Sequence, residues 1–160
     1  REARISRRRE LSVSTDVKAP SGFAVAFLNT YVGERGEGGD EASIPLRYTI
    51  EQLAGLKLER DVTVRVEYLP APEGAQLNIA WEPDKGLFPS FSGILTTEST
   101  GDCACRMTIA GTYDVPGGMA GQLFDAVLGV RIAHGTIAEL LDRFRVAIEA
   151  DYQQRTEYSP

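Results

Sequence analysis

The sequence is poor in residues that commonly carry chemistry: it has one histidine, two cysteines and one tryptophan among 160 residues. No segment approaches the ~18 consecutive apolar residues that a membrane span needs, so stable membrane insertion is not expected. Acidic residues outnumber basic ones, 23 to 17, for a formal net charge of -6. Because phosphate backbones are bound by basic surfaces, this balance argues against a nucleic-acid partner.

The two cysteines, Cys103 and Cys105, stand in the tripeptide CAC. On a strand they would share one face with their Cα atoms about 6.6 Å apart, which is the far end of the range for a disulfide. No second group of histidines or cysteines completes a metal site. The pair therefore predicts two small buried side chains in a reducing, cytoplasmic protein, with neither metal nor cofactor.

Sequence signatures of catalysis and phosphate binding are also missing. There is no G-x-S-x-G, and the glycine-rich segment GERGEGGDE is acidic and follows an expected helix, whereas phosphate loops join a strand to a helix. The one basic run is REARISRRRE, residues 1–10, and we interpret it as a solvated arm. Residues 11–153 then form a single domain and residues 154–160 a tail.

What the sequence does contain is a series of alternating segments. LSVSTDV, SIPLRYTI, VTVRVEY, QLNIAW, FSGILTT and CRMTIAGTY each place apolar side chains at every second position, which is typical of strands with one buried face. The connections between most of them are short turns, so we expect an antiparallel meander of six to seven strands. A short helix follows the first strand from Ser21, with Phe23, Phe27 and Tyr31 at helical spacing.

After VPGG the period changes to that of a helix, from Met119 to about Tyr152. At heptad spacing its apolar stripe comprises Leu123, Val127, Val130, His134, Ile137, Leu141, Phe144 and Ile148. A sheet with one apolar face needs a cover, and this helix is the only long one. The sequence thus predicts an α+β fold in which a curved antiparallel sheet wraps around a long C-terminal helix.

This order resembles the START-like, or SRPBCC, superfamily with its helix-grip fold. The likeness is carried by LSVSTDVKAPSGFAVAFLNT, by FSGILTTES with CRMTIAGTYDVPGGMAGQLFD, and by the terminal helix. The resemblance implies a cavity between the sheet and that helix. Members of the superfamily bind sterols, other lipids, hormones or polyketides, and some catalyse cyclisation or dehydration.

The residues expected to line such a cavity are mostly aromatic side chains on inward phases, together with two positions of the terminal stripe. They are Phe27, Tyr31, Tyr48, Tyr68, Trp81, Phe91, Met107, Tyr113, Val130 and His134. Tyrosine and tryptophan combine an apolar body with one polar atom, which suits a small-molecule site, although plain core packing would use the same pattern.

His134 leaves three interpretations open: a neutral core histidine with a satisfied ring, a polar group that orients a ligand, or a general acid/base paired with Tyr113 or Tyr68. The favoured function is binding of an apolar or aromatic small molecule, such as a lipid or polyketide. The alternatives are a polyketide cyclase/dehydrase-like enzyme using His134 and a tyrosine, and a partner-binding domain with a filled core. The residues favour a binding protein over an enzyme, and a homodimer is left open.

Overall fold

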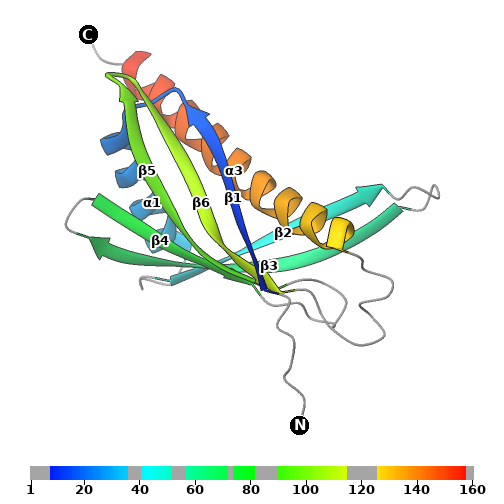
Figure 1. Cartoon of the computed structure of the whole chain (residues 1–160). Helices are drawn as coiled ribbons and strands as arrows, with labels where there is room; N and C mark the ends of the chain where they lie inside the picture. Colours follow the sequence, from blue (N-terminus) through cyan, green and yellow to red (C-terminus); the bar gives the residue numbers. More distant parts are fainter. Residues whose placement is uncertain are drawn as a thin grey trace.

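The computed structural model describes residues 8–35, 41–51, 57–71, 74–81, 90–114 and 126–157. Its architecture is α+β, an open antiparallel sheet with a long C-terminal helix, as the sequence predicts (Figure 1). The elements in chain order are β1 (Arg8–Val17), α1 (Ser21–Arg35), β2 (Glu41–Glu51), β3 (Lys57–Ala71), β4 (Gly74–Trp81), β5 (Ser90–Gly101), β6 (Ala104–Asp114) and α3 (Ala126–Glu157).

Within the described ranges the sheet has six strands, in the order β1-β6-β5-β4-β3-β2, and each neighbouring pair is antiparallel. Strands β2 to β6 form a meander, and β1 pairs with β6 at the far edge. Helix α1 therefore connects the two edge strands and must cross the sheet. Helix α3 contacts β1, β2, β6 and α1 and lies along the concave side of the twisted sheet (Figure 1).

The core lies between this sheet and the helices, and the strand alternation was predicted correctly wherever the structure describes side chains. On β6, Cys105, Met107, Ile109 and Tyr113 are buried, whereas Arg106 is exposed. The inward residues of β3, β4 and β5 follow the same rule and are Val64, Val66, Leu77, Ile79, Trp81, Phe91 and Leu95. Since a strand has a period of two, burying one face fixes every side chain on it.

Two glycines make room for an aromatic ring in this core. Gly93 on β5 and Gly111 on β6 are register partners, and the ring of Phe91 lies over both. A Cβ atom on Gly93 would meet the Ala110 carbonyl oxygen at 2.6 Å and Phe91 Cζ at 2.7 Å. The Phe91 ring in turn stacks on Trp81, with centroids 4.8 Å apart. The missing side chains thus let two large rings pack flat against the sheet.

The buried face of α3 differs from the predicted stripe. Ile137, Leu141, Phe144 and Ile148 are buried as expected, but His134 is exposed, so its predicted place on the buried stripe is wrong. An α-helix drifts by about 20° for every seven residues relative to a strict heptad. A stripe extended backwards from Ile148 through Leu141 has therefore rotated away from the core at His134. The buried face there is supplied instead by residues that the heptad omitted, namely Ala133, Thr136 and Leu140.

Three further details refine the predicted limits. Cys105 is buried on β6, but Cys103 precedes that strand and is exposed, so the prediction of two buried cysteines is wrong for Cys103. Strand β1 already begins at Arg8, within the segment predicted as an arm, and α3 continues to Glu157, into the predicted tail. Neither of the described helices has a segment apolar enough to cross a membrane.

Candidate functional site

Helix α1 carries two apolar stripes side by side. Ala24, Leu28 and Val32 form the first stripe and are buried in the core. The second stripe is Phe23, Phe27 and Tyr31, each one residue earlier in the chain, and these rings are only partly buried. Successive helical residues are rotated by about 100°. The second stripe therefore faces sideways, along the C-terminal half of α3, which lies beside α1 (Figure 1).

The aromatic stripe is attached to α3 at both ends. Phe23 meets Tyr152 edge to face with ring centroids 5.1 Å apart, and Tyr31 meets Phe144 in the same way at 5.6 Å. Because residue 23 pairs with 152 and residue 31 with 144, the two helices run antiparallel along this contact. Phe27, in the middle of the stripe, stacks on Tyr31 at 6.0 Å.

A groove of about 420 Å³ lies along this aromatic stripe. Its lining consists of Phe23, Ala26, Phe27, Thr30 and Tyr31 from α1, with Asp151 and Arg155 from α3. We call it the α1–α3 groove. A second hollow of about 510 Å³ lies over β1 and β6. Its lining among the described residues is Glu10, Leu11, Ser12, Ala110, Gly111 and Thr112, none of which is aromatic. The α1–α3 groove is therefore the better candidate for recognising an organic molecule.

One ion pair marks the polar end of the α1–α3 groove. Arg155 Nε donates to Asp151 Oδ2 at 3.1 Å, one helical turn apart on α3. The Asp151 side chain is 30% exposed and that of Arg155 is 70% exposed, so the carboxylate lies deeper than the guanidinium. The pair offers a ligand both hydrogen-bond acceptors and donors beside the rings.

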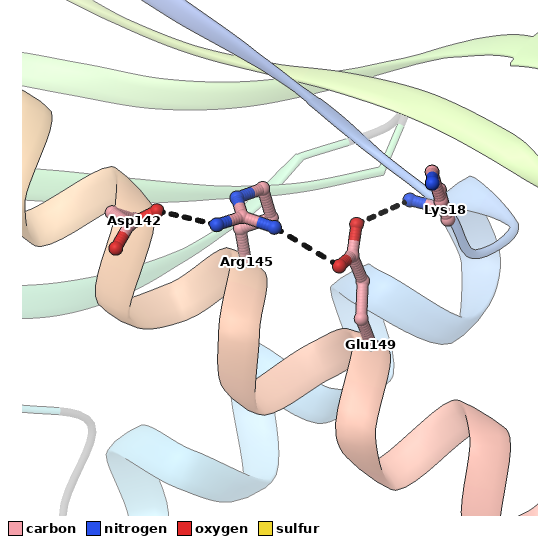
Figure 2. A network of polar contacts seen from close by, with 4 residues as sticks. All are labelled: Lys18, Asp142, Arg145 and Glu149. Carbon is pink, nitrogen blue, oxygen red and sulfur yellow. Dashed lines mark hydrogen bonds and ion pairs between the residues drawn. The ribbon is translucent and has the colours of Figure 1, made fainter.

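A polar network fastens the start of α1 to α3 (Figure 2). The backbone N–H of Lys18, just after β1, donates to Glu149 Oε2 at 2.9 Å. Arg145 donates to Glu149 Oε1 at 3.0 Å and to Asp142 Oδ1 at 2.6 Å. The hydrogen bond to Asp142 is the main reason that the pKa of Arg145 is raised above its ordinary value. The charged guanidinium holds the Glu149 carboxylate in place.

Tyr152 also connects α3 with the turn between β5 and β6. Its hydroxyl donates to Cys103 Sγ at 3.6 Å, and this hydrogen bond is the first cause of a raised pKa at Tyr152. Tyr152 thus touches both the turn and Phe23. It links the exposed Cys103 to Phe23, which lines the α1–α3 groove.

The residues predicted to line a site are distributed over three environments. Phe27 and Tyr31 line the α1–α3 groove. Trp81, Phe91, Met107 and Tyr113 belong to the core and are 0–3% exposed. His134 faces solvent on α3. The side chains of Tyr48, Tyr68 and Val130 lie outside the described ones, although their backbones belong to β2, β3 and α3.

Five lining residues were not predicted: Phe23, Ala26, Thr30, Asp151 and Arg155. Phe23 shares the spacing of Phe27 and Tyr31, so the repeat of four residues was a usable signal. The predicted helix ends near Tyr152, which assigns Arg155 to the tail. The spacing of Asp151 and Arg155, four residues apart with opposite charges, is typical of a continuing helix and could have extended it.

Comparison with known proteins identifies the fold. No protein-family model matches the sequence, and no curated protein does. Among solved structures, an aromatase/cyclase from a Streptomyces species has a TM-score of 0.52 and 16% identity, covering 93% of this chain and 96% of its own. A Thermus thermophilus protein has a TM-score of 0.58 and 14% identity, covering 89% and 99%.

A third solved structure is norcoclaurine synthase from Thalictrum flavum, in complex with dopamine and hydroxybenzaldehyde. It has a TM-score of 0.52 and 12% identity, and the alignment covers 97% of this chain and 90% of that one. These proteins share the helix-grip fold, and this chain has the same fold. Fold alone does not define an activity, so a function has to be inferred from the residues of the site.

Proposed function

We propose that this protein binds an apolar or aromatic small molecule, and that the α1–α3 groove is the site. The observation that carries the proposal is a hollow of about 420 Å³ with Phe23, Phe27 and Tyr31 along one wall. Small-molecule sites typically have volumes of about 300–1,000 Å³ and a mostly apolar lining with few polar groups. The groove matches both criteria.

The chemistry of the lining favours a flat ligand with one polar end. Offset or edge contacts between aromatic rings contribute about 0.5–1.5 kcal/mol each beyond the burial of area. Asp151 can accept a hydrogen bond from a ligand hydroxyl, and Arg155 can donate one to a ligand carbonyl, while the ion pair between them stays in place. The complex of norcoclaurine synthase with dopamine and hydroxybenzaldehyde supports a ligand of this size and kind on this fold.

The enzymatic alternative requires proton transfer between His134 and a tyrosine, of which Tyr113 is the one whose side chain the structure describes. A general base must lie within hydrogen-bond reach of the group with which it exchanges a proton. His134 is exposed on α3, whereas Tyr113 is 3% exposed on the inward face of β6. One side chain faces solvent and the other faces the core, so the geometry supports binding rather than proton transfer between them.

The partner-binding alternative would be favoured by a continuous exposed apolar surface. Among the described residues, the exposed large hydrophobic side chains are Ile94 and Val146. Ile94 lies on the outer face of β5, whereas Val146 lies on α3, which packs on the other face of the sheet. Two isolated side chains on opposite sides do not form such a surface.

The binding proposal can be tested with prodan, a neutral naphthalene dye whose emission reports an apolar environment. We expect saturable binding to the wild-type protein and about tenfold weaker binding to Phe27→Ala, equivalent to about 1.4 kcal/mol. Ala26 is exposed and lines the groove, so Ala26→Trp fills it without disturbing the core and should abolish binding.

Val146→Ala is the matched control, because it removes an exposed aliphatic group from α3 outside the groove. Equal losses in Phe27→Ala and Val146→Ala, or normal binding to Ala26→Trp, would contradict the groove as the site. Mass spectrometry of the gently purified protein, first native and then denatured, would identify a ligand that the protein carries from its source.

A further inference from the structure

The corner between β1 and α1 is held by a side chain from the far end of the chain. Val17 and Ala19 are buried on either side of Lys18, and α1 begins at Ser21. The Lys18 backbone N–H donates to Glu149 Oε2 at 2.9 Å, across 131 positions of sequence. A charged acceptor makes a stronger hydrogen bond than a neutral one, so this contact defines where α1 starts relative to α3.

The Glu149 carboxylate is itself held in one orientation. Its second oxygen accepts from Arg145 at 3.0 Å, and Arg145 is bound on its other side by Asp142 at 2.6 Å (Figure 2). The Glu149 side chain is 18% exposed, less than that of Arg145 at 31% or Asp142 at 57%. With both oxygens engaged, Glu149 has little freedom to release the Lys18 N–H.

This contact lies next to the α1–α3 groove without lining it. Phe23 follows Lys18 by five residues, and the Phe23 ring meets Tyr152, which follows Glu149 by three residues. Asp151, at the polar end of the groove, lies between Glu149 and Tyr152 in sequence. A shift of the corner would therefore move the aromatic wall on α1 relative to the polar groups on α3.

We propose that Glu149 is a positioning residue for the α1–α3 groove: by holding the Lys18 backbone, it sets the distance between the aromatic stripe and the Asp151–Arg155 pair. This inference rests on the proposed function for its effect on binding, but the positioning itself can be measured without a ligand. Binding sites require their walls to be held within about 0.5 Å, so a loosened corner should weaken binding.

The test compares four variants by prodan titration, well below the unfolding temperature of each. Glu149→Ala removes the acceptor and should weaken binding about tenfold, while Glu149→Gln keeps an oxygen for the Lys18 N–H and should lose less than about threefold. Asp142→Asn keeps the Oδ1 acceptor for Arg145 and leaves both hydrogen bonds of Glu149 in place, so it should bind normally. Lys18→Ala should also bind normally, because the contact uses the backbone and not the lysine side chain.

A second readout is the ¹⁹F spectrum of protein labelled with fluorophenylalanine. The Phe23 and Phe27 resonances should move in Glu149→Ala and stay in place in Lys18→Ala and Asp142→Asn. If they do not move in Glu149→Ala, the positioning role is wrong, whatever the dye shows. If the wild-type protein binds no prodan yet these resonances move, the binding proposal fails and the positioning role stands. If Lys18→Ala and Glu149→Ala changed prodan binding and the ¹⁹F resonances equally, the positioning role of Glu149 would also be wrong.

Discussion

Two apolar regions of this molecule use similar side chains and differ in what covers them. Under the sheet, Trp81, Phe91 and Met107 are almost completely enclosed by other residues. Along α1, Phe23 and Phe27 are only partly covered and border a groove. An apolar pattern therefore predicts the direction in which a side chain points. It does not predict whether the protein itself fills the space in front of that side chain.

The largest contrast is expected between two residues that were both predicted to line a site. Met107→Ala empties a fully buried position and should lower the free energy of unfolding by about 2–5 kcal/mol, with prodan binding of the folded protein unchanged. Phe27→Ala removes a partly exposed ring and should cost only about 1 kcal/mol while weakening binding. Urea unfolding and prodan titration of both variants test this contrast. Similar losses of stability would contradict the assignment of Met107 to the core and Phe27 to the groove.

A smaller effect is expected when the core is overfilled. Gly111→Ala places a Cβ atom against the Ser92 carbonyl oxygen and the Gly93 Cα, both backbone atoms. Overpacking of this kind costs about 1–3 kcal/mol. Gly22→Ala on α1 is the matched control, because its Cβ would meet no atom within 4 Å, and alanine should stabilise a helix by about 0.5–1 kcal/mol. Thermal unfolding of the pair should therefore shift in opposite directions.

The two cysteines extend the comparison to reactivity. Iodoacetamide should modify Cys103 in the native protein, whereas Cys105 should react only after unfolding, because burial raises the pKa of its thiol. Peptide mass spectrometry distinguishes the two sites. Rapid native labelling of Cys105 would show that this part of the core opens readily.

The same pKa shift has a consequence for stability. Below about pH 8.5, the ordinary pKa of a cysteine, the Cys105 thiol is protonated in the folded and unfolded states alike. Above that pH the unfolded chain loses the proton while the folded chain retains it, so stability falls as the pH rises. Replacing Cys105 with serine or alanine should remove this slope, as followed by urea unfolding at several alkaline pH values.

The smallest effect is expected at the single histidine. His134 is exposed, so His134→Ala should change the free energy of unfolding by no more than about 0.5 kcal/mol and leave prodan binding as it is. A loss of prodan binding in this variant would indicate that His134 belongs to the binding site and would contradict the α1–α3 groove as that site.

The strands were the most predictable part of the molecule, for a physical reason. One-residue errors on a strand reverse its faces, so alternation such as that of Val64, Arg65 and Val66 leaves one solution. On a helix the error accumulates gradually. That drift placed His134 on the wrong side of α3 while leaving Phe144 and Ile148 correctly buried.

The candidate site was predictable only in part, because it depends on contacts between distant segments. The four-residue repeat of Phe23, Phe27 and Tyr31 is visible in the sequence, and two of these residues were predicted to bind a ligand. The partners on α3 could not be identified, since nothing local to Asp151 or Glu149 shows that α1 lies beside them. Arg155 could be predicted as a lining residue only if α3 was known to continue beyond Tyr152.

The hydrogen bond from Lys18 to Glu149 has a consequence for how relatives of this protein will diverge. Its donor is a backbone N–H, which every residue except proline provides. Any residue except proline at position 18 can therefore make this contact, whereas position 149 has to supply an acceptor. Substitutions at the two positions would not be correlated, so methods that infer contacts from paired substitutions would overlook this one. In an alignment of relatives, this contact would show as an acidic residue retained at position 149 together with variable residues at position 18.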